Sequence, residues 1–332
     1  MTLARELGKR FLSLAVVLFL VTLFTALLIS MVPGDPVDTL VPLAESEEAD
    51  ALKAQVREDL NLDEPLHVRY ASWLKDFVLG DERGEHFGDY FRVSGRDPVS
   101  NRLSEALPVS LQLMVYSQVL ALVVAIPLGV LTAYRAGTVF DKLTNTGAFA
   151  LMAVPTFVPV LALAYYIGVC LNWLPPSGYV PFGEDPVEHV RRMVLPAVTL
   201  AAGQIAVYMR LLRSDMVATL QEDFIQMARA KGISDQRVLW RHALRPSSLT
   251  LLTVAGMNVG TLIGGAVVVE VIFSIPGMGT AISQAIFERQ YVALQSFVAV
   301  LAILYVVVNF AVDILYAVVD PRIRHARARA AR

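Results

Sequence analysis

Long uncharged stretches recur along most of the chain, and most charged residues lie between them. Crossing the hydrocarbon core of a bilayer takes about 20 consecutive apolar residues in a helix. None of the stretches shows the alternation of apolar and polar positions that marks a barrel strand. The pattern predicts an all-α integral membrane protein with six transmembrane helices, at roughly 12–32, 107–131, 147–172, 194–212, 249–272 and 294–318.

Lys and Arg are concentrated in alternate connections, which fixes the expected orientation. By the positive-inside rule, short loops rich in these residues face the cytoplasm. Both chain ends, the connection after the second helix and the loop between the fourth and fifth helices are therefore expected to be cytoplasmic. Their basic residues are Arg5, Lys9, Arg10, Arg135, Lys142, Arg210, Arg213, Arg229, Lys231, Arg237, Arg241, Arg245, Arg322, Arg324, Arg327, Arg329 and Arg332.

The stretch between the first two helices, residues 33–105, is expected to lie outside. It holds 17 Asp and Glu against 8 Lys and Arg. Apolar residues at 66, 70, 73, 74, 77 and 78 recur at helical spacing and predict an amphipathic helix over 66–79. Such a stripe either packs on the bundle or contacts an external partner, and packing is the commoner use.

The chain thus divides into three predicted parts. Residues 1–105 form an N-terminal anchor helix with the external segment, because the first apolar stretch is longer than the core of a signal peptide. Residues 106–320 form a five-helix domain, and residues 321–332 form a basic cytoplasmic tail. Prolines within or beside the helices predict kinks, at Pro127, Pro155, Pro159 and Pro196.

Composition excludes several functions. A formal net charge of −2 argues against a nucleic-acid surface. Cys170 is the one cysteine, and the five histidines have no ligand spacing, so neither a catalytic metal site nor a disulfide framework is expected. No phosphate-binding loop of the form Gly-x-x-x-x-Gly-Lys-Ser/Thr occurs. The chain is therefore predicted to be non-catalytic and to bind no cofactor.

The loop between the fourth and fifth helices carries the most specific pattern. Residues 221–231 predict a short helix with acids in its first turn, bases in its last and Gly232 just beyond. Phe224 and Met227 offer large apolar side chains for a contact, and the small Ala228 and Ala230 permit close approach of another surface. A solvated basic loop would explain the charge alone, without any partner.

Here the sequence resembles the permease subunits of bacterial ATP-binding-cassette (ABC) importers, in particular the first permease of the dipeptide, oligopeptide and nickel branch. Ala228 and Gly232 match the alanine and glycine of the family's cytoplasmic loop. Gln226 and Met227 replace the general Glu-Ala, a departure that suits this branch. Further matching segments are 33–36, 60–66, 126–129, 155–157, 195–197 and 270–279.

The resemblance implies a type I ABC importer permease fold, with ATP bound by other subunits and the membrane pathway formed by the permeases. It implies that residues 222–232 form a coupling helix seated on a cytoplasmic ATPase subunit, whose closure on ATP and Mg switches the bundle outward. The implied partners are a second homologous permease, two ATPase domains and an external binding protein, in the bacterial inner membrane. The implied coupling residues are Phe224, Met227, Ala228, Arg229, Ala230, Lys231 and Gly232.

Three polar residues within the predicted helices are candidates for the pathway or gate. Glu270 is an intramembrane acid, which is a functional-site hypothesis by default. It lines the pathway, pairs with a partner permease, or reaches the interfacial water. Gln204 and Asn258 are amides, which more often join helices than bind ligand.

Two other classes compete with the importer. An ion-coupled secondary transporter normally shows internal repeats or buried ionisable relays, and an intramembrane hydrolase needs histidines or paired carboxylates within the helices. Neither pattern occurs here. Peptides are the expected cargo, and nickel chelates, glutathione and haem are also compatible with the resemblance.

Overall fold

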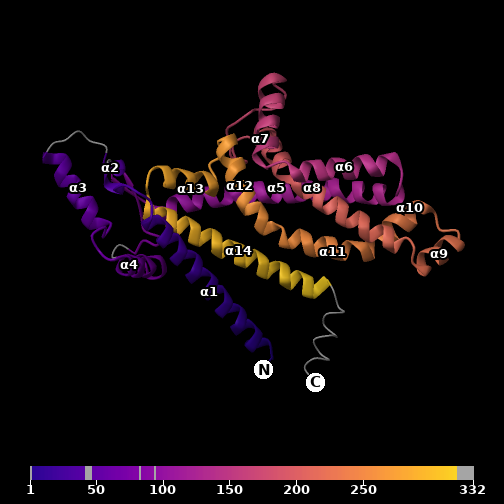
Figure 1. The fold of residues 1–332 in the computed structure, drawn as a ribbon, viewed down its shortest axis with the longest axis horizontal. Coiled ribbons are helices and arrows are strands. Elements are labelled where there is room, and N and C mark those ends of the chain that lie inside the picture. Colours follow the sequence, from indigo (N-terminus) through magenta and orange to yellow (C-terminus); the bar gives the residue numbers. More distant parts are fainter. Residues whose placement is uncertain (1, 42–46, 82–83, 93–94, 320–332) are drawn as a thin grey trace. The chain divides into compact units, whose positions relative to one another are not determined.

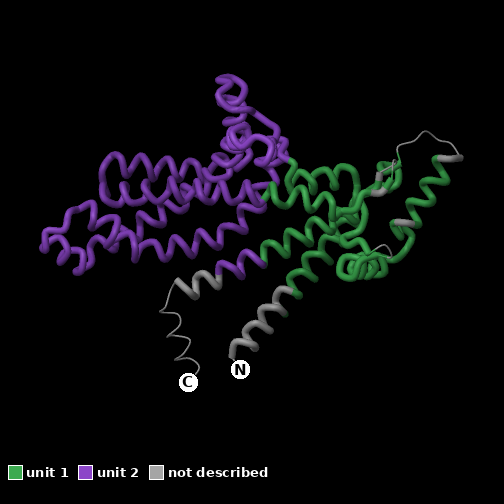
Figure 2. Tube along the Cα trace, turned by 180° about the vertical axis from the view of Figure 1, so that it is seen from behind, with its two compact units in different colours: residues 1–110, 276–306 green, residues 111–275, 307–332 purple. Residues whose placement is uncertain are grey.

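The computed structural model describes residues 2–41, 47–81, 84–92 and 95–319. The predicted basic tail lies outside these residues. The chain forms two compact units, coloured separately in Figure 2. Unit 1 comprises residues 1–110 and 276–306, and unit 2 comprises residues 111–275 and 307–332. Residues 276–306 thus belong to the same unit as the N-terminal segment.

Unit 1 combines helices with one small hairpin (Figure 1). The antiparallel strands pair Asp89 with Pro98. The elements are α1 (Thr2–Ser30), α2 (Pro36–Leu40), α3 (Glu47–Asp59), α4 (Leu66–Leu79), β1 (Asp89–Arg92), β2 (Gly95–Pro98), the start of α5 (Val99–Tyr134), α13 (Met278–Phe287) and the first part of α14 (Tyr291–Val319).

Helix α4 confirms the amphipathic helix predicted over 66–79. Its apolar stripe is partly covered from within the chain, since Tyr70 and Trp73 form a core cluster with Ala26 and Ala299, whereas Leu74 and Val78 are exposed. The polar ends of both aromatic rings are satisfied. The Tyr70 hydroxyl bonds to Thr22 Oγ1 at 2.8 Å, and Trp73 Nε1 donates to Ser296 Oγ at 2.9 Å. The packing interpretation is therefore confirmed for the side of the helix that carries these two rings.

Strand β1 is held to the turn between α13 and α14. Gln290 accepts from the Phe91 N–H at 2.9 Å and donates to the Phe91 carbonyl at 2.6 Å, as a neighbouring strand would. The buried Tyr90 donates its hydroxyl to Glu288 at 2.6 Å. These bonds satisfy an otherwise open strand edge and fix the hairpin within unit 1.

The regular secondary structure among the described residues of unit 2 is all helical. Its elements are the rest of α5, α6 (Val139–Ala153), α7 (Phe157–Leu163), a π-helical turn (Ala164–Cys170), α8 (Pro186–Thr219), α9 (Asp223–Ala230), α10 (Asp235–Arg237), a second π-helical turn (Val238–Ala243), α11 (Leu244–Met257), α12 (Val259–Phe273) and the end of α14.

Helix α8 is central to this unit and contacts α6, α7, α11 and α12. It also approaches α5 closely at Gly129. A Cβ there would lie 3.1 Å from the Leu212 side chain and from the Met209 carbonyl. The absence of a side chain at Gly129 therefore lets the two helices meet.

Three helices are long and apolar enough to cross a membrane: α5, α8 and residues Tyr291–Val312 of α14. Two bent pairs add up to two more, α6 with residues Phe157–Cys170 and Asp235–Met257 with α12, and Ala15–Ser30 of α1 is a shorter apolar helix. The six predicted stretches are therefore helical, but two of them are not continuous.

The breaks have different causes. The third stretch bends by 106° at residues 154–156. There Pro155 cannot donate a backbone bond and pushes Val154 into an extended conformation, at ψ 129°. The fifth stretch bends by 48° at Asn258, which has ψ −11° and no proline beside it. The kink predicted at Pro155 is therefore confirmed, whereas the bend at Asn258 was not predicted.

Candidate coupling helix and translocation cavity

Helix α9 lies in the loop that is predicted to couple the chain to an ATPase. It begins after Glu222, carries Asp223 in its first turn and Arg229 in its last, as the helix dipole favours. Its observed bounds, Asp223–Ala230, lie within the predicted 222–232. After it, residues Asp235–Met257 form the first part of the bent pair that continues into α12.

A glycine motif ends α9. Gly232 has φ +74°, a left-handed conformation that residues with side chains rarely adopt. Its N–H donates to the Arg229 carbonyl at 2.9 Å, and the Ile233 N–H donates to the Ala228 carbonyl at 3.2 Å. These are the two bonds of a Schellman motif. Ile233 also packs on the core that contains Ala228, so the helix end is rigidly defined.

The two sides of α9 have different surroundings. Ile225 and Ala228 are buried in the core of unit 2, against residues of the second π-helical turn such as Val238. Ala228, expected to give another surface close access, therefore faces inward. Phe224 and Met227 face outward and are 46% and 58% exposed.

Those two side chains form an apolar patch that the described residues leave about half exposed. Ala230, Lys231 and Gly232 are exposed beside it, and Arg229 Nε lies 3.7 Å from Asp235 Oδ1. Large apolar side chains grouped on the exposed side of a helix, whose other side packs in a core, are typical of a protein contact. The arrangement can transmit a push or pull from a partner into α8 and α11.

Replacing Gly232 tests whether the helix end must be left-handed. Gly232→Val is expected to weaken α9 by roughly 1–2 kcal/mol, because a side chain is strained at this φ. No neighbouring atom lies within 4 Å of the added Cβ. Gly232→Asn is therefore expected to retain most function, since asparagine tolerates this conformation. Thermal unfolding and solute uptake, compared between the two variants, measure the effect; equal losses would point to another cause.

A buried ion pair joins α6 to α8 in the same unit. Arg213 Nε and Nη2 lie 2.5 and 2.6 Å from the two carboxylate oxygens of Asp141, which is 3% exposed. The carboxylate also accepts from the Gly137 N–H at 2.8 Å and from Asn145 Nδ2 at 2.7 Å. A bidentate arginine with further donors is the arrangement that offsets the cost of burying charge.

The bundle of unit 2 also contains a cavity of about 360 Å³. Two of the predicted pathway residues, Gln204 and Asn258, lie together in its wall. Gln204 Nε2 donates to Thr261 Oγ1 at 3.0 Å. Its Oε1 is buried and accepts no hydrogen bond from the described residues. A residue that lines the cavity therefore carries a buried amide acceptor with no partner among the described residues.

Glu270, the third predicted pathway residue, does not line this cavity. It lies in the last turn of α12 and is 0% exposed. This burial excludes the idea that its carboxylate reaches water in this conformation.

The family of the chain follows from sequence comparison. A family described as "Binding-protein-dependent transport system inner membrane component" matches residues 125–325, and its N-terminal counterpart matches residues 3–114. Oligopeptide transport system permease protein AppB of Bacillus subtilis is 36% identical over 307 residues, 92% of this chain and 94% of the relative. Dipeptide transport system permease protein DppB of Escherichia coli is 34% identical over 330 residues, 92% of this chain and 95% of the relative.

Solved structures agree on the fold. A chain of the MetNI methionine ABC transporter, in inward-facing conformations, matches with a TM-score of 0.54 at 17% identity. The match covers 68% of this chain and 99% of that chain. The resemblance inferred from the sequence and the predicted permease fold are thus both confirmed. The chain belongs to the family of binding-protein-dependent transport system inner membrane components.

Proposed function

We propose that this chain is the permease subunit of an ATP-driven importer of di- or oligopeptides and forms half of the translocation pathway. The names of the relatives AppB and DppB support this cargo. A second homologous permease forms the other half, and an external binding protein delivers the peptide. Both chain ends and α9 face the cytoplasm. Hydrolysis of ATP with Mg takes place there on two partner ATPase domains, so this chain performs no catalysis.

The observation that carries the proposal is that α9 is packed into unit 2 on one side and exposed on the other. Phe224 and Met227 are exposed while the opposite side of the helix is embedded in the core of unit 2. A contact on this patch moves α8 and α11 together with α9, because the same core cluster contains residues of all three helices. An ATPase that closes on nucleotide can in this way change the conformation of the bundle.

The cavity around Gln204 and Asn258 is the proposed part of the peptide pathway. A peptide carries an N–H and a C=O at each residue, and side-chain amides can bond to both. The unsatisfied Gln204 Oε1 is suited to accept a peptide N–H as cargo passes. Glu270 is assigned a supporting role in the bundle.

Uptake by the reconstituted importer tests the proposal. Purified chain, its neighbouring permease, ATPases and binding protein are placed in liposomes with labelled dipeptide outside and ATP inside. Gln204→Ala is expected to slow uptake roughly five- to tenfold, because a lost hydrogen bond is worth about 1 kcal/mol. ATPase association should be unchanged, since the residue is remote from α9.

Gln284→Ala is the matched control, because Gln284 is an exposed amide on α13 that lies outside the cavity. It should transport at the normal rate. Dipeptide uptake that continues without ATP would contradict an ATP-driven importer and favour an ion-coupled transporter. Uptake of a nickel chelate, glutathione or haem in place of peptide would overturn the cargo assignment alone.

A further inference from the structure

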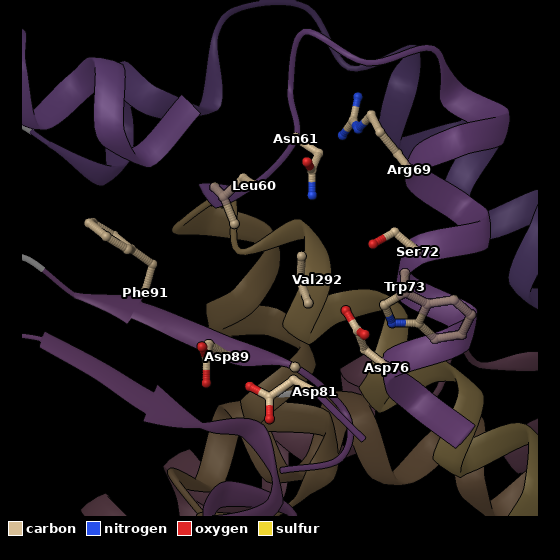
Figure 3. Close-up of a pocket in the computed structure, with 11 residues that line it drawn as sticks. Leu60, Asn61, Arg69, Ser72, Trp73, Asp76, Asp81, Asp89, Phe91 and Val292 are labelled. Carbon is tan, nitrogen blue, oxygen red and sulfur yellow. The ribbon is translucent and has the colours of Figure 1, made fainter. Parts of the chain in front are cut away.

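Unit 1 contains a cavity of about 200 Å³ beside α4, the hairpin and the start of α14 (Figure 3). Its wall carries charges of both signs, which is unusual for a pocket formed only by packing. Arg69, Ser72, Trp73 and Asp76 border it from α4. The remaining lining residues are Leu60, Asn61, Asp81, Gly88, Asp89, Phe91 and Val292.

Arg69 and Asp76 face this cavity without being paired to each other. They lie seven residues apart on α4, which places them on one side of the helix about 10 Å apart along its axis. Neither side chain makes a hydrogen bond or ion pair with another described residue. Burial raises the pKa of Asp76 above its ordinary value, the charge of Lys75 opposes this shift, and the charge of Asp81 adds to it.

A smaller cavity of about 50 Å³ adjoins the first and shares Leu60, Arg69, Trp73 and Val292 with it. Its lining residues include Tyr291 and Gln295. The Tyr291 hydroxyl and Gln295 Nε2 are buried and have no partner among the described residues. Gln295 is only 8% exposed. Leaving such a group unsatisfied costs about 1–3 kcal/mol, so these donors indicate a place where an acceptor binds.

The two adjoining cavities therefore offer hydrogen-bond donors at one end and carboxylates at the other. Arg69, Tyr291 and Gln295 present donors at one end, which suits a carboxylate. Asp76, beside Asp81 and Asp89, places a carboxylate at the other end, which suits an ammonium group. Among the described residues these acids do not form a group that could hold a metal ion. A ligand that carries both charges on one molecule would match both ends.

We propose that these two cavities form a binding site for a short zwitterionic peptide, with its C-terminal carboxylate at Arg69 and its N-terminal ammonium near Asp76. An extended peptide of three residues spans about 10 Å, which equals the rise along α4 between Arg69 and Asp76. Trp73 and Phe91 offer apolar contacts for its side chains. The proposal rests on the proposed function for the substrate class, but it places peptide on the permease itself, in unit 1.

Calorimetric titration of the complete importer in lipid nanodiscs, without the binding protein, tests this site. The probes are trialanine, N-acetyl-trialanine and trialanine amide. Trialanine is expected to bind saturably, and each end-blocked form at least tenfold more weakly. Arg69→Gln should weaken trialanine binding at least tenfold and abolish the preference over the amide. Asp76→Asn should do the same for the acetylated form.

Lys142→Gln and Asp50→Asn are matched controls, because each removes an exposed charge that does not line either cavity. They should leave trialanine binding unchanged. Since Arg69→Gln could disturb packing, Gln295→Leu serves as a second variant and should weaken binding of trialanine more than of its amide.

Three results would overturn the site: no saturable binding of trialanine, equal binding of the blocked peptides, or variants that weaken docking of the binding protein while leaving trialanine binding intact. The last would assign the surface to a protein contact. Failure of the proposed function is distinguishable, because it would abolish uptake of dipeptide while trialanine still bound to the wild-type complex.

Discussion

An importer that carries both Phe224→Asp and Met227→Asp is expected to assemble in the membrane but to lose its ATPase and its uptake. The two side chains are the exposed apolar patch of α9. Burying a side chain of this size against a partner contributes about 1.5–3 kcal/mol, and an aspartate in its place must be desolvated as well. A combined loss above about 3 kcal/mol weakens association more than a hundredfold.

Co-purification of the ATPase and ATP-dependent dipeptide uptake measure this effect. Gln221→Asp with Gln226→Asp adds the same charge at exposed positions of the same loop, so it should retain both activities. Ile225→Asp, on the buried side of α9, should instead lower the thermal stability of the chain. Normal uptake by the Phe224/Met227 variant would show that α9 is no coupling element, whatever its geometry.

Local features were predictable because the residues that cause them lie close together in the sequence. The stripe over 66–79 predicted the bounds of α4 correctly. The acids, bases and Gly232 around α9 predicted its position to within a residue or two, and the Schellman bonds supply the reason. Which side of α9 faces the core was not predictable, because Ala228 is as compatible with a close external contact as with burial.

Features that join distant segments could not be found in this way. Arg69 comes near Tyr291 and Gln295 only because α4 packs beside α14, across more than half the chain. Gln204 and Asn258 were each recognised as intramembrane amides, but their shared cavity depends on how α8 meets α12. The bend at Asn258 could not be predicted from a proline, because none lies beside it, and it is determined by packing against neighbouring helices.

The ion pair of Asp141 and Arg213 is the strongest example, and it leads to the second large effect. Their separation of 72 residues hid the pairing, because the sequence places each of them among the charges of a loop. Arg213→Met is expected to destabilise the chain by roughly 3–5 kcal/mol, because it leaves a buried carboxylate without its cation. Thermal unfolding in detergent, with uptake measured in parallel, should show a large fall in both.

Comparison of variants separates the loss of attraction from the burial of an unpaired charge. Arg213→Lys keeps a cation but cannot reproduce the two-point contact, so an intermediate loss is expected. Asp141→Asn combined with Arg213→Met removes both charges, and the introduced amide can still accept from the Gly137 N–H and lies within reach of Asn145. The double variant should therefore be more stable than Arg213→Met alone. If the double variant were less stable, Arg213 would be supporting the α6–α8 contact through packing of its aliphatic chain, and not by neutralising the Asp141 carboxylate.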